Sequence, residues 1–158
     1  MSRYGQTYTK FNISIDAASP SSLPEGTFRT GSRTTYSVRL ANIGNMDSDE
    51  VCFLFMIPPR RPVSFFCRLR SLKIASGIVS SKSPVAPQQV PTPKKQLLDF
   101  ERVHNVAKGD ATTVRFEVQS EQLDLVGVDG VRAPHKGMYT LLFTNGVDAH
   151  ASVDVIVE

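Results

Sequence analysis

The chain has 158 residues, of which 41% are hydrophobic and 21% are charged. This length is typical of one domain, and the apolar fraction is large enough for one core, which excludes a chain that is disordered throughout. Lys and Arg number 18 against 15 Asp and Glu, a formal net charge of +3. Because no long basic run or recognised motif accompanies this small excess, we expect no nucleic-acid partner.

No apolar run in the sequence is long enough to cross a bilayer, so we expect no membrane span. Residues 1–8 lack the apolar stretch of a signal peptide. If a larger parent protein is exported, its targeting signal lies outside this chain, and a secreted, vacuolar or lysosomal parent stays open. In a secretory pathway, Asn12 in Asn12-Ile13-Ser14 would be an N-glycosylation acceptor.

The first third of the chain predicts two strands. Apolar and polar residues alternate over residues 9–17, which indicates a half-buried strand. A linker rich in Ser, Pro and Gly follows at 19–26, and a second alternating strand is expected at 34–41. Residues 42–49 are rich in Asn, Asp and Gly, which favour turns.

Residues 51–57 predict a strand that is apolar on both faces and ends at a Pro-Pro pair. Such a strand is normally covered on both sides. One of its two side-chain sets is therefore expected in the core, and the other is exposed or lies under the following segment. The candidate docking surface consists of Cys52, Leu54, Met56, Phe65 and Phe66.

Residues 60–93 form an insertion between strands. Its first half interleaves apolar and basic residues, as a short basic amphipathic helix does, and its second half is a long loop rich in Ser, Pro and Gln. Cys67 lies here, and Cys52 lies in the preceding strand. The two thiols either pair or stay separate and partly buried, and we favour the second interpretation.

Strand patterns and turn signals alternate along the rest of the chain. Strands are expected at 97–106, 112–118, 138–143 and 151–157. A short 3₁₀ piece or turn is expected at residues 120–123, and Asn145-Gly146 is a hairpin signal. Six or seven short strands without a long helix predict an all-β fold. We expect an immunoglobulin- or fibronectin type III-like antiparallel β-sandwich of about seven strands with one long insertion loop.

The reactive residue types form no catalytic or metal-binding pattern. The three histidines have no metal-ligand spacing relative to one another or to the cysteines. Residues 45–49 space three oxygen side chains as a calcium loop does. Glu50 stands where such a loop needs Gly, however, and Met56 stands where it needs Glu, so we interpret this stretch as a turn.

Two carboxylate pairs could in principle serve as the acid and base of a glycosidase, namely Asp47 with Asp49 and Asp99 with Glu101. Asp99 and Glu101 have basic neighbours in the sequence, which favours a solvated surface pair. No nucleophile elbow, phosphate loop or dinucleotide fingerprint occurs. We therefore predict no catalytic residue, no cofactor and no metal.

A series of short segments occurs in a fixed order along the chain. They are residues 4–11, 34–40, 42–44, 48–51, 58–59, 95–103, 109, 113–118, 129–130 and 137–140. No segment is specific alone, but the ordered set resembles the fibronectin type III-like domain at the C-terminal end of glycoside hydrolase family 3 enzymes, the β-glucosidases and β-xylosidases. The resemblance covers nearly the whole chain except the insertion.

The resemblance implies a single domain over residues 1–158, with residues 1–10 leading in from a preceding domain. In that family the catalytic aspartate and glutamate lie in preceding domains, and no position here matches their motifs. The resemblance thus implies a non-catalytic domain that packs on the catalytic domains of its own parent enzyme. Weak contact with polysaccharide gains little support, because the chain has no Trp. Alternatives are a free-standing binding or adhesion module for a protein or glycan, and an enzyme in its own right.

Overall fold

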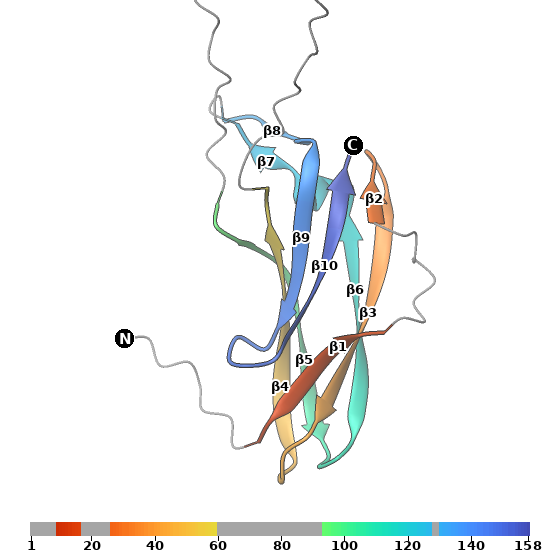
Figure 1. Cartoon of the computed structure of the whole chain (residues 1–158), viewed down its shortest axis with the longest axis vertical. Coiled ribbons are helices and arrows are strands. Elements are labelled where there is room, and N and C mark those ends of the chain that lie inside the picture. The colour runs from red at the N-terminus through yellow and green to blue at the C-terminus, as the bar shows by residue number, and fades with distance from the viewer. Residues whose placement is uncertain (1–8, 17–25, 60–92, 128–129) are drawn as a thin grey trace, which may run out of the picture.

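The computed structural model describes residues 9–16, 26–59, 93–127 and 130–158. Within these ranges the chain forms ten strands and one 3₁₀ turn, and two of its three sheets are the packed layers of a sandwich (Figure 1). The described part of the chain is therefore nearly all-β, as the sequence predicts.

One layer is a three-stranded antiparallel sheet in the order β1-β3-β6. Its strands are β1 (Phe11–Ile15), β3 (Arg33–Asn42) and β6 (Ala111–Gln119). Buried and exposed residues alternate along β6 and along the second half of β3. The period-two pattern that predicts these strands is therefore also the pattern of their burial.

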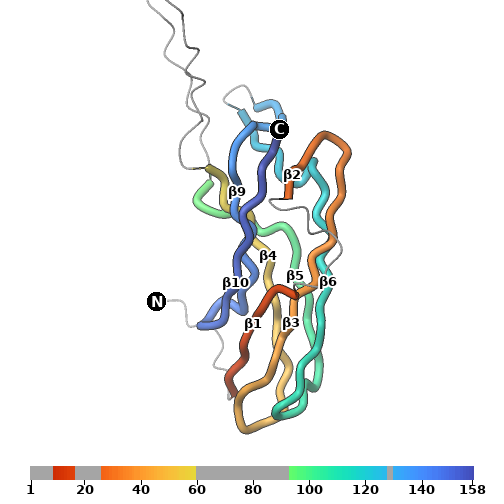
Figure 2. The backbone as a smooth tube through the Cα atoms, turned by 45° about the vertical axis from the view of Figure 1, so that its right-hand side comes forward, coloured from red at the N-terminus to blue at the C-terminus, as the bar shows by residue number. Residues whose placement is uncertain are grey.

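The other layer is a five-stranded sheet in the order β2-β10-β9-β4-β5. Its strands are β2 (Gly26–Phe28), β4 (Ser48–Ile57), β5 (Gln96–Val106), β9 (Gly137–Thr144) and β10 (His150–Val157). β2 runs parallel to β10, whereas the other pairs are antiparallel. The view in Figure 2 separates β4, β9 and β10 from β3 and β6.

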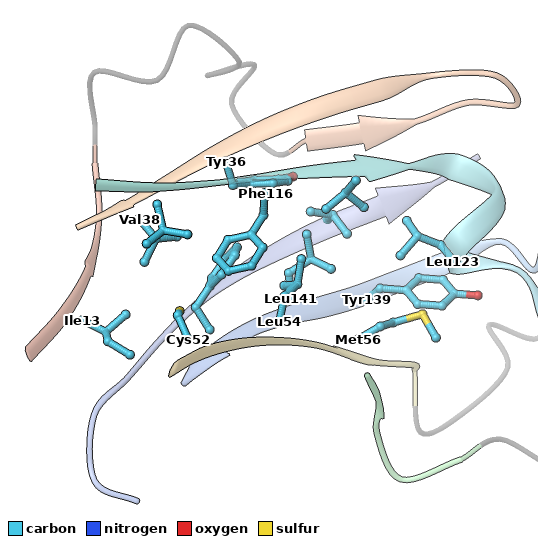
Figure 3. Packing of buried hydrophobic residues seen from close by; sticks show 14 of the residues in the cluster. Ile13, Tyr36, Val38, Cys52, Leu54, Met56, Phe116, Leu123, Tyr139 and Leu141 are labelled. Atoms are coloured by element: carbon cyan, nitrogen blue, oxygen red, sulfur yellow. The ribbon is translucent and has the colours of Figure 1, made fainter. Parts of the chain in front are cut away.

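The core fills the space between the two sheets (Figure 3). Val38 and Phe116 point into it from the three-stranded sheet, and Leu54 and Leu141 point into it from the five-stranded sheet. The rings of Phe116 and Phe143 bridge the layers with centroids 5.6 Å apart. Each side chain of this size stabilises the fold by about 1.5–3 kcal/mol when it is fully buried.

The strands that the sequence predicts are all present, and they are the seven longest of the described part of the chain. The 3₁₀ turn (η1) is confirmed at Ser120–Leu123. Three strands were not predicted: β2, β7 (Leu125–Val126) and β8 (Arg132–Ala133), the last two forming a small sheet of their own. Strands of two or three residues are too short to show a period in the sequence.

Several sequence predictions concern residues outside the described ranges. These are the lead-in segment up to residue 8, the helix and loop within residues 60–92, and the side chains of Phe65, Phe66 and Cys67. Nothing in the described part of the chain forms a helix with the length and apolarity that a membrane crossing needs.

Candidate functional site

The side chains on the two faces of β4 differ in burial. Cys52, Leu54 and Met56 point into the core, with exposed fractions of 0%, 1% and 0%. The prediction that these three side chains belong to a docking surface is therefore wrong. Successive side chains on a strand point to opposite faces, and this set faces the three-stranded sheet (Figure 3).

The outward set of β4 consists of Val51, Phe53, Phe55 and Ile57, all half-buried. These side chains lie on the outer face of the five-stranded sheet, away from the three-stranded sheet. A sheet with a solvated outer face normally carries polar residues there. The apolar character of both β4 faces, which the sequence shows, thus leaves an apolar surface on the outside of the sandwich.

Neighbouring strands extend this apolar surface. Phe53 lies opposite Phe100 of β5, while Phe55 lies between Leu97 of β5 and Leu142 of β9. Residues directly opposite each other on paired strands project to the same face of the sheet. We call the set Phe53, Phe55, Ile57, Leu97, Phe100 and Leu142 the outer patch.

The aromatic members of the outer patch contact one another. The Phe53 ring lies 6.1 Å from the Phe55 ring and 6.4 Å from the Phe100 ring, centroid to centroid, and both pairs are tilted. The Lys95 ammonium nitrogen lies 4.3 Å from the centre of the Phe55 ring, a cation–π geometry. Phe100 stays 58% exposed and Leu97 46% exposed, so water reaches most of the surface over β5.

Polar residues border the outer patch on the side of β10. Ser152 lies opposite Leu142, and Asp154 lies opposite Thr140. The Thr140 hydroxyl donates to an Asp154 carboxylate oxygen at 2.7 Å. Arg102, opposite Val51, borders the patch on the side of β5. The outer face therefore has an apolar centre with polar groups at these two borders, and Met138, which lies opposite Ile156 and is 60% exposed, adds an apolar residue beyond Thr140.

Asp49 connects β4 to β5. Its carboxylate accepts hydrogen bonds from the backbone N–H of Asn105 at 3.0 Å and from the Arg102 guanidinium at 2.8 Å, and lies 2.8 Å from His104 Nδ1. The Asn105 amide, followed by His104 and Arg102, lowers the pKa of Asp49 to about 2. Asn105 has a positive φ of 51°, and the bond to Asp49 helps to hold this turn-like conformation within β5.

The other acidic residues of this region also make structural contacts. Asp47 accepts the backbone N–H of Lys108 at 2.7 Å, in the turn between β5 and β6. The turn interpretation of residues 45–49 fits these bonds, since two of its three oxygen side chains are engaged by neighbouring backbone. Among the described residues, no group of three or more His, Cys, Asp or Glu side chains could hold a metal ion.

Asp99 and Glu101 share one side of β5, as alternation predicts. They lie opposite Leu54 and Cys52, which is the side that faces the core, but both are exposed because β5 is the edge of its sheet. Glu101 lines an open groove of about 630 Å³ between β5 and β6, made by residues 101–104 and 112–115. The expectation of a solvent-exposed pair is confirmed.

Two further predicted residues have clear positions. Cys52 is a free, buried thiol, and burial raises its pKa to about 12, so it stays protonated at neutral pH. Asn12 is exposed on β1, and its glycosylation stays a prediction.

Sequence reasoning missed two buried polar side chains. Glu50 is 6% exposed at the start of β4, and burial raises the pKa of its carboxyl. Asn42 is 1% exposed at the end of β3. Both stand in a stretch rich in Asn, Asp and Glu that looks like a solvated turn. Asn42 donates to the Val106 carbonyl of β5, and Asn145 of the β9–β10 turn lies beside Glu50, so contacts with distant segments accompany their burial.

The sequence matches a known family over part of its length. Residues 82–146, less than half of the chain, match the family model of the fibronectin type III-like domain. This part of the chain is similar to a fibronectin type III-like domain. The matched stretch includes β5, β6 and β9, and the resemblance stated from the sequence is confirmed at this level. No curated protein matches the sequence.

Solved structures align with nearly all of the chain. A β-glucosidase from Listeria innocua in complex with glucose aligns with a TM-score of 0.66 at 18% identity, over 98% of this chain and 17% of its own. β-Glucosidase 3B from Thermotoga neapolitana aligns with a TM-score of 0.62 at 14% identity, over 97% and 16%. The β-glucosidase EmGH1 from Erythrobacter marinus aligns with a TM-score of 0.62 at 17% identity, over 98% of this chain and 16% of its own. At these identities the likeness shows the fold, and this chain spans about one sixth of those enzymes.

Proposed function

We propose that this chain is a non-catalytic accessory domain of a glycoside hydrolase family 3 enzyme of the β-glucosidase or β-xylosidase type. In this role it packs on the catalytic domains of its parent and stabilises them. The observation that carries the proposal is the alignment of 97–98% of the chain with only 16–17% of three β-glucosidases. In such a chain most of the protein lies outside the sandwich.

The positions of the carboxylates support this proposal. Asp47 and Asp49 hold the backbone of β5 and of the turn that follows it. Asp99 and Glu101 lie at an exposed sheet edge, and Glu101 lines an open groove. A glycosidase acid needs a raised pKa in a partly dry site, whereas the pKa of Asp49 is lowered by its hydrogen bonds.

The test is an activity assay on the isolated chain together with the complete reading frame of its gene. We expect no hydrolysis of aryl β-glucosides or β-xylosides by the isolated chain, and a reading frame that also encodes a (β/α)₈-type barrel and an α/β domain. Robust turnover of these substrates by the isolated chain would contradict the proposal. Turnover that persists in the double variant Asp99→Asn, Glu101→Gln would place the catalytic groups elsewhere.

A second candidate function is glycan binding by a free-standing module. The exposed Phe100 ring and its neighbour Phe53 favour it, because sugar rings stack on aromatic faces. Micromolar binding of a glucan or xylan by the isolated chain in affinity electrophoresis or calorimetry would support this candidate.

A further inference from the structure

If the chain is an accessory domain, one of its surfaces must contact the remainder of the longer protein. We infer that the outer patch is this surface, and that its occupant is an apolar face of the catalytic portion of the same polypeptide. This inference rests on the proposed function, and it adds the face, the residues and the kind of contact.

The first argument is the continuity of the patch. Cross-strand pairing joins Phe100 to Phe53, and Leu97 through Phe55 to Leu142, so that apolar side chains extend without interruption over β5, β4 and β9. Isolated exposed apolar residues are common on soluble proteins, but contiguous apolar areas mark interaction sites. Most of the outward positions of β4 are apolar, which the sandwich itself does not require, because the core lies on the other side of the sheet.

The second argument is the arrangement of polar groups around the patch. On one side, the Thr140 hydroxyl donates a hydrogen bond to Asp154. On the other, the Arg102 guanidinium donates one to Asp49. Protein interfaces have this anatomy, with an apolar centre and a polar rim whose groups stay partly solvated. Lys95, above the Phe55 ring, is the rim cation nearest the centre. A partner surface with an acidic group at this corner would complement it.

The third argument identifies the occupant. The structural relatives are β-glucosidase chains in which a sandwich of this kind is about one sixth of the protein. If this chain belongs to such an enzyme, as proposed above, the same polypeptide provides a large surface for it to contact. Ile57, Leu97 and Leu142 are aliphatic and lie among the rings, which suits the side chains of a protein interface. A sugar would instead need hydrogen-bonding groups between the aromatic rings.

The experiment compares two double variants in two forms of the protein. Phe100→Ser with Leu97→Ser removes the most exposed part of the patch, and Ile43→Ser with Val126→Ser removes two other apolar side chains of similar exposure, 63% and 51%. In the isolated chain we expect each pair to change Tm by no more than about 2 °C, since exposed positions contribute little to stability. In the protein expressed from the complete reading frame, we expect the patch pair alone to lower Tm by at least about 5 °C.

A binding measurement in trans separates docking from stability. We expect the isolated chain to bind the separately expressed catalytic portion, and the patch pair to weaken this binding more than tenfold, as loss of an aromatic anchor does. If the reading frame encodes no glycosidase domain, the proposed function fails together with this inference. If glycosidase domains are present but the patch pair behaves like the control pair, this inference alone is overturned.

Two other outcomes would assign the patch to a different occupant and so overturn the inference. Self-association of the isolated chain that the patch pair abolishes, measured by sedimentation velocity, would assign the patch to a second copy. Glucan or xylan binding that the patch pair abolishes would assign it to carbohydrate.

Discussion

Asn42 illustrates how one buried polar residue fixes one end of the sandwich. Its Oδ1 accepts the Thr9 hydroxyl at 2.8 Å and the Gly44 N–H at 3.1 Å. Its Nδ2 donates to the carbonyl oxygens of Met46 at 2.8 Å and Val106 at 3.0 Å. The chain before β1, the β3–β4 turn and the end of β5 therefore meet on a single amide whose hydrogen-bonding capacity is fully used.

We expect Asn42→Ala to lower the free energy of unfolding by about 2–4 kcal/mol. The substitution removes four hydrogen bonds and leaves buried donors and acceptors unpaired, each at a cost of about 1–3 kcal/mol before relaxation. Urea denaturation followed by circular dichroism measures the change. Asn45→Ala, at an exposed position of the same turn, is the control and should shift stability by less than about 0.5 kcal/mol. A loss below about 1 kcal/mol for Asn42→Ala would contradict the role given to this amide.

Glu50 predicts a pH dependence of stability. Its pKa in the folded protein is raised above the ordinary 4.5, mainly by burial, with the Val51 amide and the Asn145 side chain acting in the opposite direction. Folding therefore favours the protonated carboxyl. Its contribution to stability is fully present below pH 4.5 and is lost as the pH rises through the folded pKa.

Glu50→Gln cannot ionise, so we expect this variant to gain stability relative to the wild type as the pH rises from about 4 to 7. Denaturant titrations at several pH values measure the difference between the two proteins. Glu101→Gln, at an exposed site on β5, is the control and should show no such trend. A difference for Glu50→Gln that is constant over this range, or that falls with pH, would refute the expectation.

At the scale of elements, β5 is an edge strand of 11 residues that pairs with β4 alone among the described strands. Long unpaired edges invite pairing with another chain, and natural sheets discourage this with charged side chains that point inward at the edge. Asp99 and Glu101 lie on the inward side of β5, opposite Leu54 and Cys52, and remain exposed. This gives the two carboxylates a physical role without catalysis.

We therefore expect Glu101→Val to promote self-association. The substitution removes an inward-pointing charge and raises the β-propensity of the edge. Sedimentation velocity over a range of protein concentrations should show dimers or larger species for this variant. Glu121→Val makes the same change of charge in η1, away from the β5 edge, and should stay like the wild type. Equal behaviour of the two variants would mean that Glu101 does not protect the edge.

The same elements show what the sequence could and could not predict. Alternation placed β3 and β6 because each has one buried face, so period and burial coincide. In β4 both faces are apolar, so the sequence identified the strand but not its inward side, and Cys52, Leu54 and Met56 were assigned to the wrong face. The contacts of Asp49 join residues more than 50 positions apart, and nothing in the local sequence indicates such a pairing.

At the scale of the whole molecule, the five-stranded sheet has two apolar sides with different roles. Its inner side packs on the three-stranded sheet and forms the core. Its outer side carries the outer patch, in which Phe100 and Leu97 are exposed in the described structure. We expect this core to suffice for a folded sandwich, so the patch should contribute stability only when it is covered.

A pair of leucine substitutions in the isolated chain tests this division. Leu54 is 1% exposed and points inward, whereas Leu97 is 46% exposed and points outward from the neighbouring strand. We expect Leu54→Ala to cost about 2–5 kcal/mol, because it leaves a cavity between the sheets, and Leu97→Ala to cost less than about 1 kcal/mol. Guanidinium denaturation of both variants and the wild type gives the two values. If Leu97→Ala were as costly as Leu54→Ala, the outer patch would already be packed within the isolated chain, and no apolar surface would be left for a partner to cover.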